Sequence, residues 1–385
     1  MDYRKEAVAL LSDLVAIPSV STEPGERDIG EYVARFGEAL GMEVERQYID
    51  DNRFNVIARA KIGTGKGKTV ALNSHMDVVP AAQGWDTDPF TLTVKGGRAY
   101  GRGATDAKGC LAALMIATKA IVENPADTNG NLILTAVADE ETNSRGARYL
   151  VEHGNLNADY AIVGEPTESR VALGHNGSLR PFLVIHGRTA HSSTPDLGIS
   201  AVRVAAYISG LVDERQAELR KVLHPTTGHP SMAITIVRAD VKENVLPDYC
   251  EMVIDRRMVP GEVEGEIVAD LEAMCAQAEK AFPGARVKID HYLMTTGPAS
   301  EVKENSPIAR IAYAACEAVT GEKQKPFGLT CNTDMNHFMR IGIPTVIIGP
   351  NIIDICHKPN EYVELEQLEK ACKVDESVIR ALMNS

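Results

Sequence analysis

Three short apolar runs that each end in potential metal ligands constrain this chain more than any other feature of its sequence. The run TVALNS leads to His75 and Asp77, NLILTAVA leads to Glu140 and Glu141, and YAIV leads to Glu165. Short apolar runs of this kind predict buried strands. Open α/β sheets gather their reactive groups at the carboxyl ends of such strands. The pattern therefore predicts an α/β fold with a metal-dependent site at the strand ends.

Two further candidate ligands lie outside these runs. Asp106 stands in the glycine-rich turn GRGATDAKG, ahead of a helix predicted over residues 110–122, and His357 stands in the loop ICHKPNEY. The acids that follow the second run repel one another, and a cation or a protonated carboxyl would relieve this repulsion. A set of one Asp, two Glu and two His, without Cys, suits zinc, cobalt or manganese.

The number of ligands indicates two metal ions. Five are too many for one tetrahedral catalytic ion with an open position, but they suit two ions that share a bridging carboxylate. A carboxylate beside the pair is then free to take a proton from water. Successive residues on a strand point apart, so Glu140 and Glu141 have different roles, although the residue types alone do not assign them.

The order of the predicted elements indicates two domains, as the length of 385 residues also favours. Beyond Ser178 the pattern changes to β-α-β-β-α-β, which is typical of a ferredoxin-like domain. The predicted elements of this insert are strands at 180–186, 231–238, 249–258 and 285–293 and helices at 200–219 and 262–280. Helix and strand alternation then resumes, with a strand at 345–348 and a closing helix at 365–383. We therefore expect a catalytic α/β domain with a mixed sheet, formed by residues 1–178 and 294–385, and an inserted domain formed by residues 179–293.

One motif resembles a phosphate-binding loop without satisfying its spacing. The run GTGKGKT at residues 63–69 has Ile62 where the first glycine of that loop should be, and a strand follows it instead of a helix. We predict a hairpin turn at residues 63–68.

Charge and composition exclude some partners. The net charge of −13 argues against nucleic acids and anionic membrane surfaces as partners. No apolar run approaches the length of a bilayer span, and the amphipathic N-terminus does not resemble a signal peptide. The seven cysteines lack a C-x-x-C pair and fit reduced thiols, so we expect a cytoplasmic protein.

Several motifs in the same order resemble those of a known enzyme family. SHMDVVP, GRGATDAKG, ADEET, GEPT and HKPNEY together resemble the zinc aminoacylase and carboxypeptidase family. This family includes acetylornithine deacetylase, succinyl-diaminopimelate desuccinylase, aminoacylase and carboxypeptidase G. The resemblance covers essentially the whole chain, because the inserted domain stands where the family carries its lid and dimerisation domain.

The resemblance implies a role for each candidate ligand. His75 and Glu165 would hold one Zn²⁺, Glu141 and His357 would hold the other, and Asp106, whose peptide bond to Ala107 is often cis in the family, would bridge the two. Co²⁺ or Mn²⁺ would be able to replace zinc. Asp77 would orient His75, and Glu140 would act as the general acid/base that assists the attack of metal-bound water on an amide carbonyl.

The resemblance also implies substrate contacts from the insert. His191, in GRTAHSSTP, matches the lid histidine that reaches into the active site of the other subunit to stabilise the oxyanion, which predicts a homodimer through the lid domain. Asn244 and Arg257 match the positions that grip the carboxylate of the substrate. Only one of Arg256 and Arg257 should face the site, and we prefer Arg257. His175, His337 and Cys356 are interpreted as bystanders.

One departure bears on the substrate. Desuccinylases carry the run GGTSD before the final strand, whereas this chain has TCNTD at residues 330–334, of which only Asp334 is identical. A deacetylase or another hydrolase of small N-acyl amino acids is therefore favoured over a strict desuccinylase. The alternatives are a dipeptidase or carboxypeptidase with the same chemistry, and a catalytically dead metal-binding protein, which the presence of Glu140 disfavours.

Overall fold

The computed structural model describes residues 1–23, 25–293 and 297–385, and the chain forms two compact units. Unit 1 comprises Met1–Gly174, Glu301–Leu329 and Thr333–Ser385, and unit 2 comprises His175–Ser300 and Thr330–Asn332. The boundary expected at residue 294 lies outside the described residues. The chain passes between the units within the short strands β8 (Gly174–His175) and β13 (Ser300–Glu301), and again on either side of Thr330–Asn332.

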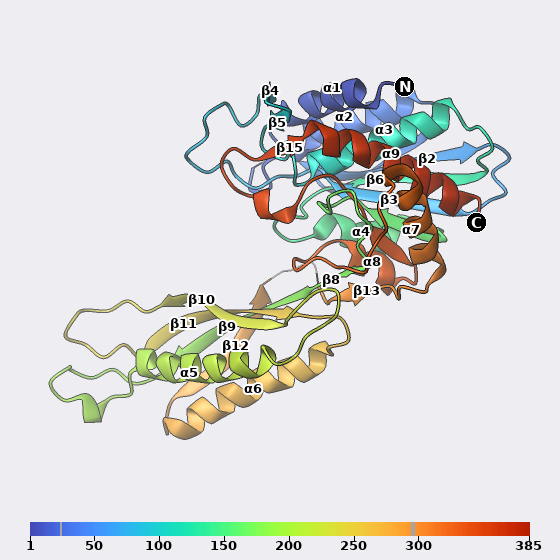
Figure 1. Cartoon of the computed structure of the whole chain (residues 1–385). Coiled ribbons are helices and arrows are strands. Elements are labelled where there is room, and N and C mark those ends of the chain that lie inside the picture. Colours follow the sequence, from blue (N-terminus) through green and yellow to red (C-terminus); the bar gives the residue numbers. More distant parts are fainter. Residues whose placement is uncertain (24, 294–296) are drawn as a thin grey trace. The chain divides into compact units, whose positions relative to one another are not determined.

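A six-stranded mixed sheet forms the centre of unit 1 (Figure 1). Its strands are, in spatial order, β1 (Glu43–Asp50), β2 (Arg53–Ile62), β6 (Gly130–Val137), β3 (Thr69–His75), β7 (Tyr160–Val163) and β14 (Thr345–Ile347). The last four run parallel, whereas β1 and β2 pair antiparallel. Because the parallel strands are covered on both faces, they read as continuous apolar runs in the sequence. The predicted α/β class with a mixed sheet is confirmed.

Helices cover both faces of this sheet. They are α1 (Tyr3–Val15), α2 (Glu26–Ala39), α3 (Lys108–Glu123), α4 (Arg145–His153), α7 (Pro307–Thr320), α8 (Met335–Arg340) and α9 (Leu365–Met383). A Cβ at Gly30 of α2 would lie 2.9 Å from the Phe54 ring, and one at Gly154, after α4, would lie 3.3 Å from Ile57. Phe54 and Ile57 have opposite parity on β2, so α2 and α4 lie on opposite faces of the sheet. α3 and α9 pack against β3.

Unit 1 also contains smaller elements near the candidate ligands. A second sheet of three strands has the order β15 (Tyr362–Glu364), β5 (Arg98–Tyr100) and β4 (Thr93–Lys95). The 3₁₀ helix η2 (Ile353–Ile355) precedes His357. None of the helices in the described part of the chain is long and apolar enough to span a bilayer.

The prediction of a hairpin at residues 63–68 is wrong. A turn is present, and Gly63 and Gly65 have φ values of 57° and 69°. The strands that it joins do not pair with each other, because β6 lies between β2 and β3 and bonds to both. The sequence next to a turn indicates that the chain reverses, but it does not indicate that a later strand enters between the two arms.

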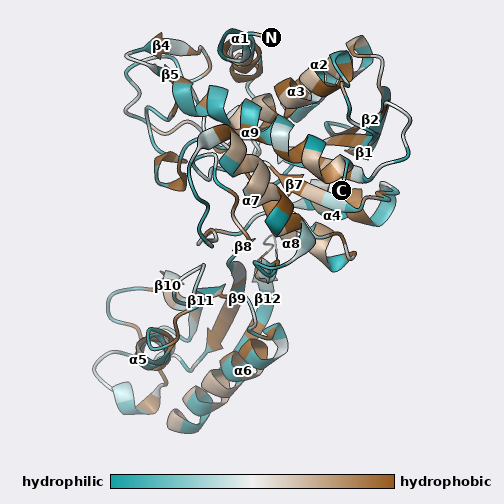
Figure 2. Ribbon diagram, turned by 45° about the vertical axis from the view of Figure 1, so that its right-hand side comes forward, coloured by the Kyte–Doolittle hydropathy of each residue, from teal (hydrophilic) through white to brown (hydrophobic). Residues whose placement is uncertain are grey.

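Unit 2 has the predicted order β-α-β-β-α-β. Its elements are β9 (Gly177–His186), α5 (Ala201–Leu219), β10 (Ser231–Arg238), β11 (Tyr249–Met258), α6 (Glu264–Ala281) and β12 (Arg286–Leu293), with the 3₁₀ helix η1 (Pro195–Leu197) before α5. The four strands form an antiparallel sheet in the order β10-β11-β9-β12. α5 and α6 lie along one face of it, and the apolar sides of these helices, brown in Figure 2, close a core around Ile185, Ile208 and Leu271.

Candidate metal centre

The five predicted ligands of unit 1 form one continuous cluster. His75, at the end of β3, places Nε2 3.1 Å from Asp106 Oδ1 and 3.9 Å from Glu165 Oε1. The other carboxylate oxygen of Asp106 lies 3.2 Å from His357 Nε2. His357 Nε2 in turn lies 3.1 Å from Glu141 Oε2. Asp106 thus stands between two imidazoles, and the Nε2 atom of each imidazole faces both Asp106 and a glutamate.

The tautomer of His75 suits a metal ligand. Its Nδ1 lies 3.0 Å from the backbone carbonyl oxygen of Asp77, which can only accept a hydrogen bond. Nδ1 therefore carries a proton, and Nε2, which faces Asp106, is the ring nitrogen left to bind a metal, as in other histidine ligands whose second nitrogen is held by a hydrogen bond. The Asp77 carboxylate contacts His75 less closely, with Oδ1 at 3.5 Å from Nδ1. Its closer partners are the backbone amides of Glu140 and Glu141, each at 3.0 Å.

Asp106 is held by a carboxylate that the sequence did not single out. Oε1 of Glu361 accepts hydrogen bonds from the backbone amides of Thr105 at 2.9 Å and Asp106 at 3.0 Å. The other oxygen of Glu361 binds the buried guanidinium of Arg102. The peptide bond between Asp106 and Ala107 is cis, as expected from the family resemblance. Glu361 belongs to the motif HKPNEY, and this motif was the available signal for it.

The titration behaviour of the cluster reflects buried negative charge. Burial and the neighbouring carboxylates hold the pKa values of Glu140 and Glu165 well above their ordinary range. Burial, with the charge of Asp106, also raises the pKa of Glu141 to about 7. Burial alone would raise the pKa of Asp106, but hydrogen bonds from His357 and His75 outweigh it and lower the pKa. Divalent cations would relieve this repulsion, so the residues present fit the predicted metal pair.

The donor set has the composition expected for such ions. One ligand atom from each of His75, Asp106 and Glu141 falls within 4.8 Å of the others. Imidazole and carboxylate without thiolate suit zinc, cobalt or manganese. Burial raises the pKa of the neighbouring Cys356 thiol, which favours its protonated, non-ligating form.

A buried polar network supports the cluster from behind. Asp334 accepts hydrogen bonds from Asn73 Nδ2 at 3.0 Å and from Ser144 Oγ at 3.1 Å. Ser144 Oγ also lies 3.2 Å from His337 Nε2. Asn73 stands two residues before His75, and Ser144 follows the turn that carries Glu141. His337 thus contacts this network through Ser144, and its interpretation as a bystander to the chemistry stays a prediction.

The predicted substrate residues all belong to unit 2, and two of them are neighbours. The backbone amide of Ser192 donates to the carbonyl oxygen of Asn244 at 2.9 Å, which joins the loop of His191 to that of Asn244. His191 is exposed, and its Nδ1 accepts from the backbone amide of Ser193 at 3.2 Å. Its proton is therefore on Nε2, which is the tautomer that can donate to an oxyanion.

The two arginines of β11 have different environments. Arg256 is 3% exposed and binds Glu262 and the carbonyl oxygen of Arg257. Arg257 points to the opposite face of the sheet, where its Nε lies 2.7 Å from Asp255 Oδ1. Of the two, Arg257 is the more accessible, with 29% of its side chain exposed.

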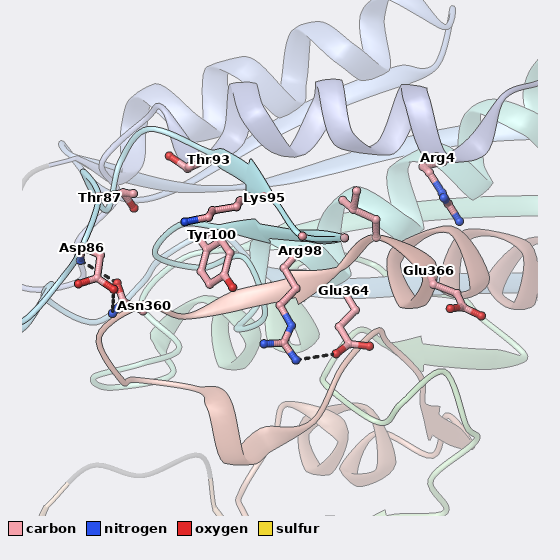
Figure 3. A pocket seen from close by; sticks show the side chains of 13 residues that line it. Arg4, Asp86, Thr87, Thr93, Lys95, Arg98, Tyr100, Asn360, Glu364 and Glu366 are labelled. Carbon is pink, nitrogen blue, oxygen red and sulfur yellow. Dashed lines mark hydrogen bonds and ion pairs between the residues drawn. The ribbon is translucent and has the colours of Figure 1, made fainter.

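A cavity of about 610 Å³ on unit 1 lies apart from this chemistry (Figure 3). It opens beside β4, β5 and β15, and its lining includes Lys95, Arg98, Tyr100, Asn360 and Glu364. Arg98 and Glu364, which face each other on the adjacent strands β5 and β15, form an ion pair in its lining at 3.3 Å. None of the five clustered ligands lines this cavity, so its size is no guide to the reactive site.

Imidazoles and carboxylates gathered at the strand ends and adjoining loops of an α/β sheet are typical of a metal-dependent enzyme. Residues 71–381 match Peptidase family M20/M25/M40, and the chain belongs to this family. It is 29% identical, over 374 residues, to acetylornithine deacetylase of Proteus mirabilis (strain HI4320), covering 94% of this chain and 93% of that protein. The family resemblance seen in the motifs is confirmed, and the protein is an M20 family metallo-hydrolase.

Solved structures share the fold over the whole chain. Aminopeptidase PepT from Bacillus cereus has a TM-score of 0.80 at 20% identity, with 98% of each chain covered. The YXEP protein of Bacillus subtilis, described as a dinuclear metal binding peptidase from the M20 family, has a TM-score of 0.73 at 19% identity, with 99% of each chain covered. These similarities concern the fold, and the substrate is a separate question.

Proposed function

We propose that the protein hydrolyses the amide bond of a small N-acyl amino acid, with two Zn²⁺ ions as cofactors. The observation that carries the proposal is the position of Asp106, with one oxygen 3.1 Å from His75 and the other 3.2 Å from His357. In this arrangement His75 and Glu165 would hold one ion, His357 and Glu141 the other, and Asp106 both. When bound, the ions would polarise the amide carbonyl and lower the pKa of water.

Glu140 is assigned as the general acid/base. It follows β6 beside the ligand Glu141, and both amides of this pair are fixed by the Asp77 carboxylate. Glu140 removes a proton from the attacking water and delivers it to the leaving amine. Burial raises the pKa of the Glu140 carboxyl, which makes it a better proton acceptor from water than an exposed glutamate.

Unit 2 is assigned the role of lid and dimerisation domain, with His191, Asn244 and Arg257 as its substrate-binding side chains. The Nε2 proton of His191 is available to stabilise the developing oxyanion, and Arg257 would exchange its contact with Asp255 for the carboxylate of the substrate. β10 is an edge strand of its sheet, and its residue Val237 is 50% exposed to solvent. Pairing of two β10 edges about a two-fold axis would cover this strand in a homodimer.

The relative from Proteus mirabilis favours an acyl amino acid over a peptide as the substrate. A cytoplasmic location is part of the proposal, since all seven cysteines are free thiols. The second candidate function is a dipeptidase or carboxypeptidase, because human carnosine dipeptidase 1 and an M20 family metallo-carboxypeptidase from Sulfolobus solfataricus share the fold.

A hydrolysis screen separates these functions. The purified chain is incubated with Zn²⁺ or Co²⁺ and with N-acetyl, N-formyl and N-succinyl amino acids and dipeptides, and release of free amine is measured. We expect the highest kcat/KM for one N-acyl class. Preference for dipeptides would support the peptidase instead, and absence of hydrolysis in the whole panel would contradict both.

A further inference from the structure

We propose that Glu26 is a positioning residue for the turn that carries Glu140 and Glu141. This inference rests on the proposed function, in which the first of these glutamates is the base and the second a metal ligand. Glu26 is 113 residues away in the sequence, at the first position of α2, and has no ligand or base role in the mechanism above.

Three consecutive backbone amides at the end of β6 each donate to a buried carboxylate. The amide of Asp139 donates to Glu26 Oε2 at 2.7 Å. The amides of Glu140 and Glu141 donate to the two oxygens of Asp77, each at 3.0 Å. Hydrogen bonds to a charged acceptor are stronger than neutral ones. The turn is therefore fixed at three successive points, and Glu26 supplies the first of them.

Glu26 is itself held in one place. Its residue is 0% exposed, and its Oε1 binds Arg53 Nε on β2. The same guanidinium donates to the carbonyl oxygen of Ser21. Because a buried carboxylate is costly unless it is paired and hydrogen-bonded, this geometry is rigid. Through Glu26 and Arg53, the Asp139 amide is therefore held in place by α2 and β2, which lie outside the metal cluster.

The residue that Glu26 holds is the point at which the backbone changes direction. Asp139 has φ of 62°, in the left-handed region that non-glycine residues seldom adopt. Its side chain is fixed as well, with Oδ2 2.7 Å from Arg145 Nε. Without the Glu26 acceptor, this amide would be buried without a partner. Relaxation of the backbone at Asp139 would then move Glu140 and Glu141 together.

Two readouts should therefore change in parallel when Glu26 is replaced. Displacement of a reacting group by about 1 Å costs roughly 100-fold in rate, and loss of a residue that supports a ligand lowers metal affinity about 10- to 100-fold. We expect Glu26→Ala to lower kcat by about 10- to 100-fold with little change in KM. We also expect the affinity of the metal-free protein for Co²⁺, followed by visible absorption, to fall about 10-fold.

The same helix supplies a matched control. Glu31 of α2 also pairs with an arginine of a neighbouring strand, Arg46 of β1, at 3.0 Å; this pair is more exposed than that of Glu26, and in the described part of the chain the Glu31 carboxylate has no hydrogen bond to the turn. Glu31→Gln removes that pair and should leave kcat and the Co²⁺ affinity unchanged. If Glu31→Gln and Glu26→Ala lowered kcat and Co²⁺ affinity equally, the general packing of α2 would explain both effects. This result would overturn the positioning role of Glu26. Wild-type values for Glu26→Ala would overturn it as well.

A double variant separates the role of Glu26 as the acceptor for the Asp139 amide from its role as the charge partner of Arg53. It also provides a test if Glu26→Ala does not fold. Glu26→Gln combined with Arg53→Met removes both charges of the buried pair and keeps a carbonyl oxygen for the Asp139 amide. We expect this protein to exceed Glu26→Gln alone in kcat and Co²⁺ affinity, because in the single variant Arg53 competes for the same oxygen. No recovery would refute the positioning role.

The series also includes Glu140→Gln. Full activity of that variant would refute the proposed base, whereas the Co²⁺ titration of the Glu26 variants would still report on Glu141. Failure of the proposed function and failure of this inference are therefore distinguishable.

Discussion

Asp375 of α9 should make the protein less stable as the pH rises above the ordinary range of a carboxyl. The residue is 0% exposed, and neither carboxylate oxygen has a hydrogen-bond partner among the described residues. Burial holds the pKa of Asp375 well above its usual value, so the folded chain keeps a proton that the unfolded chain releases. Between the two pKa values, folding stability falls by about 1.4 kcal/mol for each pH unit of increase.

The test compares wild type with Asp375→Asn, which removes the titrating group at nearly constant volume. The free energy of unfolding in urea is measured at pH 4.5 and 5.5 with a chelator present, so that metal binding makes no contribution. We expect the free energy of unfolding of Asp375→Asn, relative to that of wild type, to increase by about 1.4 kcal/mol from pH 4.5 to pH 5.5. Glu366→Gln, at an exposed position of the same helix, should show no such change. Parallel pH dependences for wild type and Asp375→Asn would refute the reasoning, because they would mean that the buried carboxyl ionises without penalty.

Three further outcomes are expected. Chelation should abolish hydrolysis and added Zn²⁺, Co²⁺ or Mn²⁺ should restore it, with elemental analysis approaching two ions per chain; full activity in metal-free protein would contradict the mechanism. Glu140→Gln should keep the metals but lose about 100- to 10,000-fold in kcat, whereas Glu141→Gln should lower the metal content, and the reverse pattern would exchange the two roles. Co-expressed Glu140→Ala and His191→Ala chains should recover roughly a quarter of wild-type activity if the histidine acts across a two-fold interface; tagged mixed dimers without activity would exclude that role.

The candidate ligands were predictable because their signal is local. A ligand at the end of an apolar strand is visible in the sequence, and the parallel order of β6, β3 and β7 then brings Glu141, His75 and Glu165 to one edge of the sheet. The distances between Asp106 and the two histidines agree with the bridging role expected from the family motifs. The assignment of ligand and base roles still comes from the family resemblance and awaits the experiments above.

The residues that the sequence did not reveal act through contacts between distant segments. Glu26 resembles any acidic residue in the first turn of a helix, where such residues are common. Its role depends on an amide 113 positions later, which no spacing rule connects to it. Glu361 was visible only as part of a motif, and Asp375 was hidden because α9 reads as an ordinary amphipathic helix. The wrong hairpin at residues 63–68 has the same origin, since strand order is decided by a segment far along the chain.

The insertion of unit 2 between two parts of unit 1 has a consequence for biosynthesis. His75, Asp106, Glu141 and Glu165 all precede unit 2 in the chain, whereas His357 follows it. On the ribosome, the amino-terminal part of unit 1, with four of the five candidate ligands, is therefore synthesised first. About 125 residues of unit 2 are translated before the rest of unit 1 follows. β14 and α9 are also translated only after these residues of unit 2. A nascent chain that stops within unit 2 would lack one imidazole of the cluster and one edge of the central sheet, so a complete centre can form only when translation is nearly finished.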